Sequence, residues 1–167
     1  YQPAWQARQL GPAQLPGDAS VLFFCDASPT CKALDAELCG RVKLVKVRAG
    51  SNYSMRDGDI SLRPGHGDDY VRLVSDLLKQ GAFPGYILHA WPLGVSCAAI
   101  DGMPQQQSLV FDSLLFLAQA IGNEDIASPI HWLTLTHGAQ RVAGETVTSP
   151  LAALVLGPMR GTPADMP

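Results

Sequence analysis

A continuous apolar run near the start of the sequence constrains the fold more than any other feature. The segment "SVLFFCD" (residues 20–26) has five apolar residues in succession, Val21 to Cys25, and lacks the alternation expected of a strand with one face in water. Such a run is typical of a central strand in a parallel sheet, which helices cover on both faces. The sequence therefore predicts an α/β fold built around this strand.

The segments that follow alternate between helix and strand patterns. "ASPTCKALDAELCG" (residues 27–40) predicts a helix, because Ser28 can cap it, Pro29 suits its first position and Gly40 can end it. Further strands are predicted at residues 43–50, 84–91 and 129–137, and further helices at 68–81, 107–122 and 149–157, the last with Ser149 as its cap. The other segments are interpreted as an edge strand at 1–10, a connector at 11–18, a surface excursion at 51–67 with a hairpin turn at Asp57-Gly58, and a loop at 92–105.

The order of these elements predicts the fold class. Strands that alternate with helices argue for a parallel sheet with helices on both faces, and right-handed crossovers make such a sheet doubly wound. The expected fold is therefore a truncated Rossmann-like parallel sheet. The 167 residues fit one domain, in which residues 1–18 are an N-terminal strand and connector and residues 19–167 form the sheet.

Composition and charge argue against several classes of function. Hydrophobic residues make up 47% of the chain and charged residues 16%, so the chain is globular. A net charge of −3 gives no electrostatic reason to bind nucleic acid or an anionic membrane. No apolar run approaches the roughly 20 residues of a membrane span, and no secretory signal opens the sequence. The four cysteines form no CxxC pair, so we expect no metal site and a reduced, cytoplasmic setting.

The turn after the first strand lacks the usual equipment for a dinucleotide. A Rossmann sheet that binds a dinucleotide has GxGxxG here, because glycines let the backbone approach the pyrophosphate at the helix N-terminus. This turn reads "CDASPTCKAL" (residues 25–34) and contains no glycine. Asp26 would also place a carboxylate beside an anionic ligand. We therefore expect no cofactor.

Other catalytic motifs are also missing, although one nucleophilic arrangement can be drawn. No Tyr is followed by a Lys four residues later, no Gly-Lys dipeptide occurs, and "GVSCA" (residues 94–98) does not match a nucleophile elbow. Cys97 could act as a nucleophile with His89 or His137 as its base. The alternative, which we favour, is a structural cysteine with histidines at strand ends. His66 lies in a polar loop and His131 begins a predicted strand.

Five stretches together resemble a known family. They are "YQPAWQ" (1–6), "DDYVRLVSDLL" (68–78), "ILHAWPLG" (87–94), "QSLVFDSLLFLAQAIG" (107–122) and "HWLTLTHGAQRVAGETVTSPLAALVLGPMRGTPADMP" (131–167). In this order they resemble the structural, pseudo-Rossmann half of a ketoreductase domain from a modular polyketide synthase. One departure is "GTPADMP" after Arg160, where family members often continue with an Ile-Pro-Gln-Glu-like stretch.

The resemblance implies a role without catalysis. In this family the structural half binds no cofactor and packs against a catalytic half, which carries the NADPH site and the Tyr, Ser and Lys. The expected function is a non-catalytic scaffold in polyketide biosynthesis that supports a ketoreductase catalytic subdomain or neighbouring domains, with a transient acyl carrier protein contact. No catalytic, cofactor or metal residue is expected.

The sequence also suggests where a partner binds. We expect Met159, Arg160, Tyr1 and Trp5 at a partner interface, and Leu151 and Leu154 in the core. Two alternatives stay open at this point. One is a small free-standing flavodoxin-like or methyltransferase-like enzyme, with its ligand near Asp26 and His137. The other is a binding module for a carrier protein.

Overall fold

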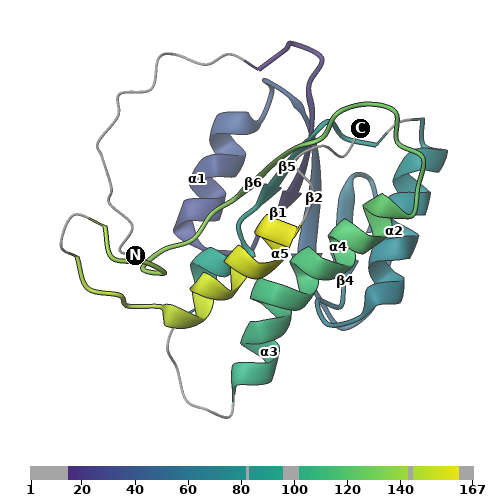
Figure 1. The fold of residues 1–167 in the computed structure, drawn as a ribbon. Helices are drawn as coiled ribbons and strands as arrows, with labels where there is room; N and C mark the ends of the chain where they lie inside the picture. The colour runs from purple at the N-terminus through teal and green to yellow at the C-terminus, as the bar shows by residue number, and fades with distance from the viewer. Residues whose placement is uncertain (1–14, 82, 96–101, 143–144, 162–167) are drawn as a thin grey trace.

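The computed structural model describes residues 15–81, 83–95, 102–142 and 145–161 and shows one sheet flanked by helices (Figure 1). The strands are β1 (Ser20–Phe24), β2 (Lys43–Ala49), β3 (Ser54–Arg56), β4 (Asp59–Leu62), β5 (Tyr86–His89) and β6 (His131–Thr134). The α-helices are α1 (Pro29–Leu38), α2 (Gly67–Lys79), α3 (Met103–Gln107), α4 (Ser113–Gly122) and α5 (Leu156–Gly161). Short 3₁₀-helices η1 (Trp91–Gly94) and η4 (Pro150–Val155) and a π-helix η3 (Ser108–Asp112) complete the described elements.

The strand order is β3-β4-β2-β1-β5-β6, and every neighbouring pair is parallel except β3 and β4. From β1 the chain first builds the sheet outward through β2 and β4. It then crosses back to place β5 on the other side of β1, followed by β6. The strand order thus reverses between β1 and β5, as in a Rossmann fold. The predicted fold class is confirmed.

Burial of β1 explains why its sequence is apolar throughout. Leu22, Phe23 and Phe24 are fully buried. Leu22 and Phe24 pack in the core beneath α2 and α4, whereas Phe23 packs on the other face with residues of α1. Full burial of a side chain of this size stabilises a fold by about 1.5–3 kcal/mol. The strand is therefore a main source of the stability of both layers.

The first two helices follow their sequence signals. In α1, the amide of Cys31 donates to Ser28 Oγ at 3.2 Å, Pro29 takes the first position, and Gly40 follows the helix with a φ of 76°. Helix α2 buries the predicted stripe, which consists of Tyr70, Leu73, Val74 and Leu77, with Leu78 partly buried beside it. Both predictions are confirmed.

The surface excursion predicted at residues 51–67 is wrong in part. The hairpin turn at Asp57-Gly58 is present, with positive φ angles of 47° and 85°. The second strand of this hairpin, β4, is however an internal strand of the sheet, because it pairs with β2 as well as β3. Ile60 and Leu62 are buried there. Two apolar residues among polar neighbours were too weak a local signal, and only the long-range pairing with β2 defines the strand.

The C-terminal helical segment differs from the prediction at two residues. It is a 3₁₀-helix, η4, that leads into α5. Ser149 was predicted as its cap, but its hydroxyl donates to the carbonyl of Val95 at 2.8 Å and makes no capping bond. Leu151 packs against the core as expected, whereas Leu154 is 39% exposed and the prediction of a core position was wrong.

The two faces of the sheet are covered unequally. Helix α1 packs on one face, and α2, α4 and α5 lie on the other (Figure 1). In the part of the chain that the structure describes, no helix is long and apolar enough to cross a membrane.

Candidate functional site

The carboxyl ends of β1 and β5 form the position where a doubly wound sheet binds ligands. The indole Nε1 of Trp91, just after β5, donates to the carbonyl of Cys25 at 3.1 Å in a buried hydrogen bond. The amide of Ala90 donates to Phe24 O at 2.9 Å. The Ala90 bond continues the main-chain ladder between β1 and β5, and the Trp91 bond adds a buried side-chain contact beside it.

Asp26 occupies the turn between β1 and α1. Its Oδ1 accepts a hydrogen bond from the Ser28 amide at 2.9 Å. Its Oδ2 lies 2.7 Å from the position that a Cβ on Gly94 would take, so this glycine is required for the close approach. Although burial alone would raise the pKa of Asp26, the hydrogen bonds from Ser28 lower it below its usual value. A carboxylate is therefore held at the N-terminus of α1.

The fold implies a dinucleotide as a possible cofactor, and this turn does not fit one. The Ser28 amide is bonded by Asp26, the Cys31 amide is bonded by Ser28 Oγ, and Pro29 has no N–H to offer. An incoming pyrophosphate would meet the Asp26 carboxylate, with the amides of Ser28 and Cys31 already bonded. The sequence predicted that Asp26 would be unfavourable for an anionic ligand. Its carboxylate lies at the N-terminus of α1, the position at which a phosphate would bind.

Two of the three described cysteines have the character of buried hydrophobes, whereas the third, Cys39, is free and exposed. Cys25 and Cys31 are buried and free. Burial raises the pKa of the Cys25 thiol to about 11 and also raises the pKa of Cys31, so neither is a thiolate at neutral pH. Cys97 lies outside the described residues. Within the described ranges, no group of three or more His, Cys, Asp or Glu side chains could hold a metal ion.

His89 is a structural residue of the core. It is fully buried on β5, its ring stacks on Phe24 with centroids 4.8 Å apart, and its Nε2 lies 3.1 Å from Ser113 Oγ of α4. Burial lowers the pKa of His89 to about 3, so the ring is neutral. The contact with Ser113 joins residues 24 positions apart, and no local sequence signal indicated it.

The other histidines are not brought together into a site. His131 and His137 are exposed and lie at the beginning and beyond the end of β6. The His131 ring stacks on Tyr86 with centroids 5.1 Å apart. His66 is exposed and directly precedes α2.

The loop after β6 closes on its own chain. Gly138 has a φ of 63°, and its carbonyl accepts hydrogen bonds from the amides of Thr148 and Ser149 at 3.0 and 2.9 Å. A Cβ at position 138 would overlap Thr148 Oγ1. Since Ser149 in turn bonds Val95, the loop ties β6 to the segment after β5. It therefore has a structural role.

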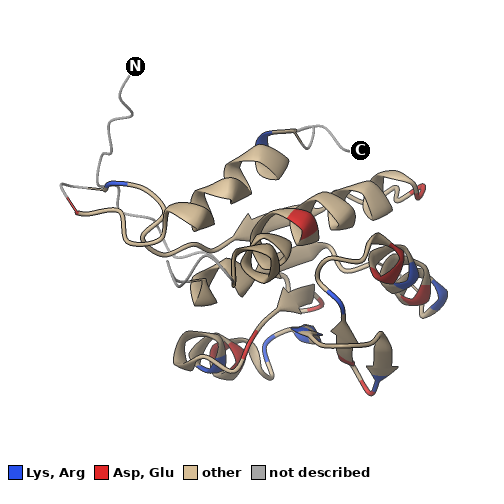
Figure 2. Cartoon of the chain, turned by 90° about the horizontal axis from the view of Figure 1, so that it is seen from below, with Lys and Arg blue, Asp and Glu red and all other residues tan. Residues whose placement is uncertain are grey.

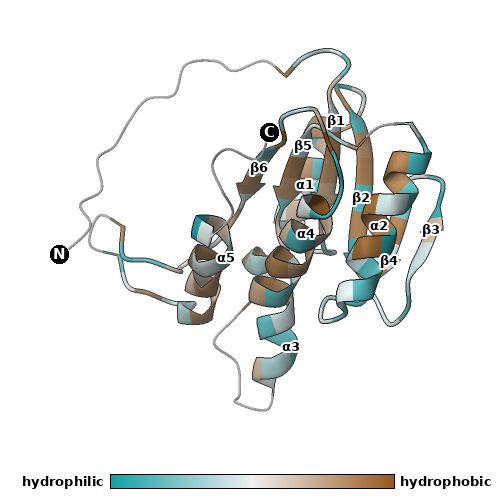
Figure 3. Ribbon diagram, turned by 45° about the vertical axis from the view of Figure 1, so that its right-hand side comes forward, coloured by the Kyte–Doolittle hydropathy of each residue, from teal (hydrophilic) through white to brown (hydrophobic). Residues whose placement is uncertain are grey.

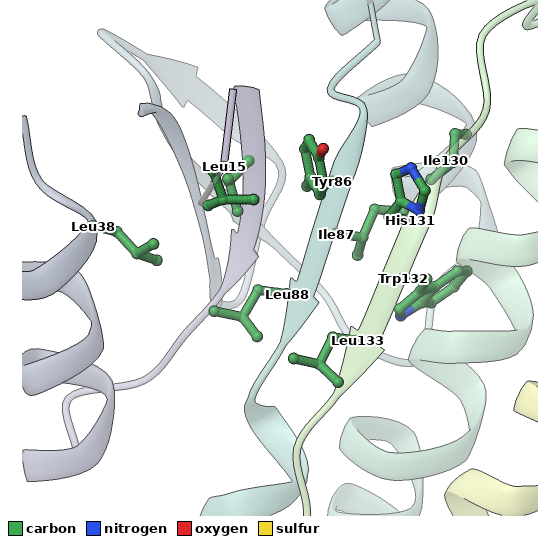
Figure 4. Close-up of a pocket in the computed structure, with 10 residues that line it drawn as sticks. Leu15, Leu38, Tyr86, Ile87, Leu88, Ile130, His131, Trp132 and Leu133 are labelled. Carbon is green, nitrogen blue, oxygen red and sulfur yellow. The ribbon is translucent and has the colours of Figure 1, made fainter. Parts of the chain in front are cut away.

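A groove lies elsewhere, on the α1 side of the sheet and toward the amino ends of the strands. Its volume is about 460 Å³. Leu38 of α1 lies on one side of the groove, Leu88 and Leu133 lie on the neighbouring strands β5 and β6, and Tyr86 and His131 lie higher on the same two strands (Figure 4). The groove is therefore mainly apolar and lies at the opposite end of β1 from Asp26.

Two of the predicted interface residues lie in α5, and two lie outside the described residues. Met159 is half-buried, and its Sδ lies 3.4 Å from Thr134 Oγ1, so it packs on β6. Arg160 is exposed. Tyr1 and Trp5 are not among the residues that the structure describes.

A family model described as "Beta-ketoacyl synthase-like, N-terminal" matches residues 19–154. The chain belongs to this family. The match begins one residue before β1 and ends within η4, so it covers the whole described sheet. No curated protein matches the sequence.

Solved structures share the fold of this family member. A keto acid-selecting NRPS module with adenylation, ketoreductase and pseudo-Asub domains superposes with a TM-score of 0.75 at 22% identity, over 92% of this chain and 13% of that chain. An N-terminal ketoreductase from the macrolactin assembly line gives 0.61 at 24% identity, over 71% and 25%. The enoyl-acyl carrier protein reductase of Bacillus cereus, solved with NADP+, gives 0.59 at 13% identity, over 87% and 66%.

These matches bear on the predicted resemblance. The chain spans 13% and 25% of the first two structures, which contain ketoreductases, and shares its fold with them. Together with the family match, this confirms the predicted resemblance to a ketoreductase structural subdomain.

Proposed function

We propose that this chain, as one domain, is a non-catalytic structural module of a polyketide synthase-type assembly line. Its family and its fold both support a role related to polyketide synthesis. The small share of the multidomain relatives that it covers is consistent with a module that works beside other domains. We place the module in the cytoplasm, where the thiols of Cys25 and Cys31 stay reduced.

The geometry of Asp26 is the main support for the proposal that this chain is not catalytic. The Asp26 carboxylate and the Ser28 hydroxyl accept hydrogen bonds from the amides of Ser28 and Cys31 at the start of α1, and the Trp91 indole bonds the Cys25 carbonyl beside them in the chain. A pyrophosphate at this helix N-terminus would have to displace the bonds to the amides of Ser28 and Cys31. In addition, the described histidines and cysteines form no acid–base pair around that position.

The partner surface in this proposal is the layer of helices α3 to α5. Residues 103–122 contain one charged side chain, Asp112, and residues 150–161 contain one, Arg160. By contrast, the 13 residues of α2 contain five, namely Asp68, Asp69, Arg72, Asp76 and Lys79. Figure 2 shows this difference, with few coloured segments on the α4 and α5 ribbons.

Low charge is typical of the centre of a protein–protein interface. Met103 and Leu154 are exposed in this layer, and Met159 is half-exposed. We therefore assign the contact with a ketoreductase catalytic subdomain, or with another neighbouring domain, to this surface, with Arg160 at its edge. An acyl carrier protein would make at most a transient contact.

Calorimetric titration of the chain with NADPH tests the non-catalytic role. We expect no binding heat, and micromolar affinity would overturn the proposal.

The partner surface is tested in the polypeptide that contains this module. Leu154→Asp should loosen the packing of the neighbouring domain and speed limited proteolysis between the two. Val71→Asp, at an exposed apolar residue of α2, is the matched control and should not speed proteolysis between the two domains. Equal effects of the two variants would reject the α3–α5 surface.

A further inference from the structure

Strand β6 is an open edge of the sheet. It is the last strand in the order β3-β4-β2-β1-β5-β6 and pairs with β5 alone. The amides of His131 and Leu135 donate toward β5, each over 2.9 Å. Because main-chain groups point alternately to the two sides of a strand, those of Trp132 and Thr134 point away from β5. Within the described part of the chain, the N–H and C=O groups of these two residues have no hydrogen-bond partner.

The sequence of this edge does not discourage pairing with another strand. Proteins usually protect a sheet edge with charged residues or proline. The opposite edge follows this rule, because β3 carries Arg56 and Asp57 comes directly after it. Residues 130–136, "IHWLTLT", contain no Lys, Arg, Asp, Glu or Pro. In β6 the side chain of Leu133 is 58% exposed on the α1 side of the sheet, and Figure 3 shows β6 as a hydrophobic strand.

This edge is complementary to a second copy of itself. Two β6 strands can pair antiparallel about a two-fold axis beside Leu133. Trp132 of each copy then exchanges main-chain hydrogen bonds with Thr134 of the other, so the outward-pointing groups of both strands are satisfied. Leu133 of one copy faces Leu133 of the other, with their Cα atoms about 4.5 Å apart. No like charges meet, because the segment contains no charged residue.

The size of the contact predicts a weak association. A stable interface buries about 1,200–2,000 Å² in total. A strand of four residues on each side supplies only a part of that area. The pair should therefore form at high concentration and dissociate on dilution.

We propose that this chain forms a two-fold dimer through β6, with Leu133 at the axis. Such an interface uses the same patch on both copies, as is usual in homodimers. The sheet then continues from one copy into the other, in the order β5-β6-β6-β5. This inference goes beyond the proposed function and is independent of it, because neither the NADPH titration nor the Leu154 variant tests this edge.

Sedimentation equilibrium of the full chain of 167 residues, from micromolar to millimolar concentration, tests the dimer. We expect the mass to rise from monomer to dimer. Leu133→Lys should remain a monomer throughout, because it places two like charges opposite each other at the axis. Val71→Lys, at an apolar residue of α2 that is 50% exposed, is the matched control and should still dimerise. An unmodified chain that stays monomeric, a dimer that persists in Leu133→Lys, or one lost in Val71→Lys would each overturn the proposal.

Cross-linking tests the position of the axis. The background for both variants carries Cys39→Ser and Cys97→Ser. In it, Leu133→Cys should give a disulfide-linked dimer on mild oxidation, because facing residues of the proposed pair lie within disulfide range. His131→Cys is exposed in the same strand, but the two copies of residue 131 would lie about 13 Å apart along the strands. This control should stay monomeric on a non-reducing gel. No cross-link from Leu133→Cys, or equal cross-linking of the two variants, would reject the proposed pairing.

Discussion

The indole of Trp91 binds the carbonyl of Cys25 at 3.1 Å and so joins the carboxyl ends of β5 and β1, which are 66 residues apart in the chain. This bond lies at the point where the strand order reverses. In dinucleotide-binding sheets the same place is a crevice for the ligand. In this sheet a buried side-chain hydrogen bond of the protein lies at that place.

Replacing Trp91 should therefore affect stability. We expect Trp91→Phe to lower the free energy of unfolding in urea by about 1–3 kcal/mol, because the buried Cys25 carbonyl loses its donor. Trp132→Phe is a matched control, since its indole Nε1 is buried without a hydrogen-bond partner among the described residues. We expect Trp132→Phe to lower the free energy of unfolding by less than Trp91→Phe does. Equal losses in the two variants would show that the hydrogen bond contributes little.

The capping contacts at the start of α1 give a second prediction. Ser28→Ala should cost about 1 kcal/mol of unfolding free energy, because the Cys31 amide loses its acceptor. Thr30→Ala removes an exposed hydroxyl one residue before Cys31 and should have almost no effect. The alternative of a free-standing enzyme predicts instead that Asp26→Ala abolishes an activity. Our proposal expects Asp26→Ala to change only the urea midpoint.

Local patterns predicted much of the fold, and long-range contacts account for the rest. The apolar run at Val21 to Cys25 and the stripe on α2 are signals within one element, and both were interpreted correctly. Strand β4 depends on pairing with β2, and the role of Ser149 depends on Val95, 54 residues away. Neither relationship leaves a local pattern in the sequence.

At the candidate site, too, local sequence signals predicted some features, and long-range contacts determined the others. The absence of glycine after β1 and the presence of Asp26 were visible in the sequence and led to the expectation of no cofactor. The burial of His89 against Ser113 and the open face at Leu133 depend on the order of strands in the sheet. That order places β6 at an edge, next to a face that α1 does not reach.

Gly138 provides a third prediction. Gly138→Ala should destabilise the chain by about 1–2 kcal/mol from its positive φ alone, with a further loss from the overlap with Thr148 Oγ1. Gly17→Ala is the control, because a Cβ there meets no atom within 4 Å. Thermal unfolding of the two variants compares them directly. A Gly138→Ala variant as stable as Gly17→Ala would contradict the tie between this loop and Ser149.

His89 makes the stability depend on pH. Burial lowers its pKa to about 3 in the folded chain, whereas an unfolded histidine titrates near 6.5. Between these values the unfolded chain binds a proton that the folded chain does not, so stability falls as pH falls from about 6.5 toward 3. The slope is at most about 1.4 kcal/mol per pH unit, and above pH 6.5 the contribution is constant.

Urea unfolding between pH 4 and 7 should show this slope in the unmodified chain and a flatter one in His89→Gln. An unchanged slope in His89→Gln would mean that His89 is not held neutral by the core.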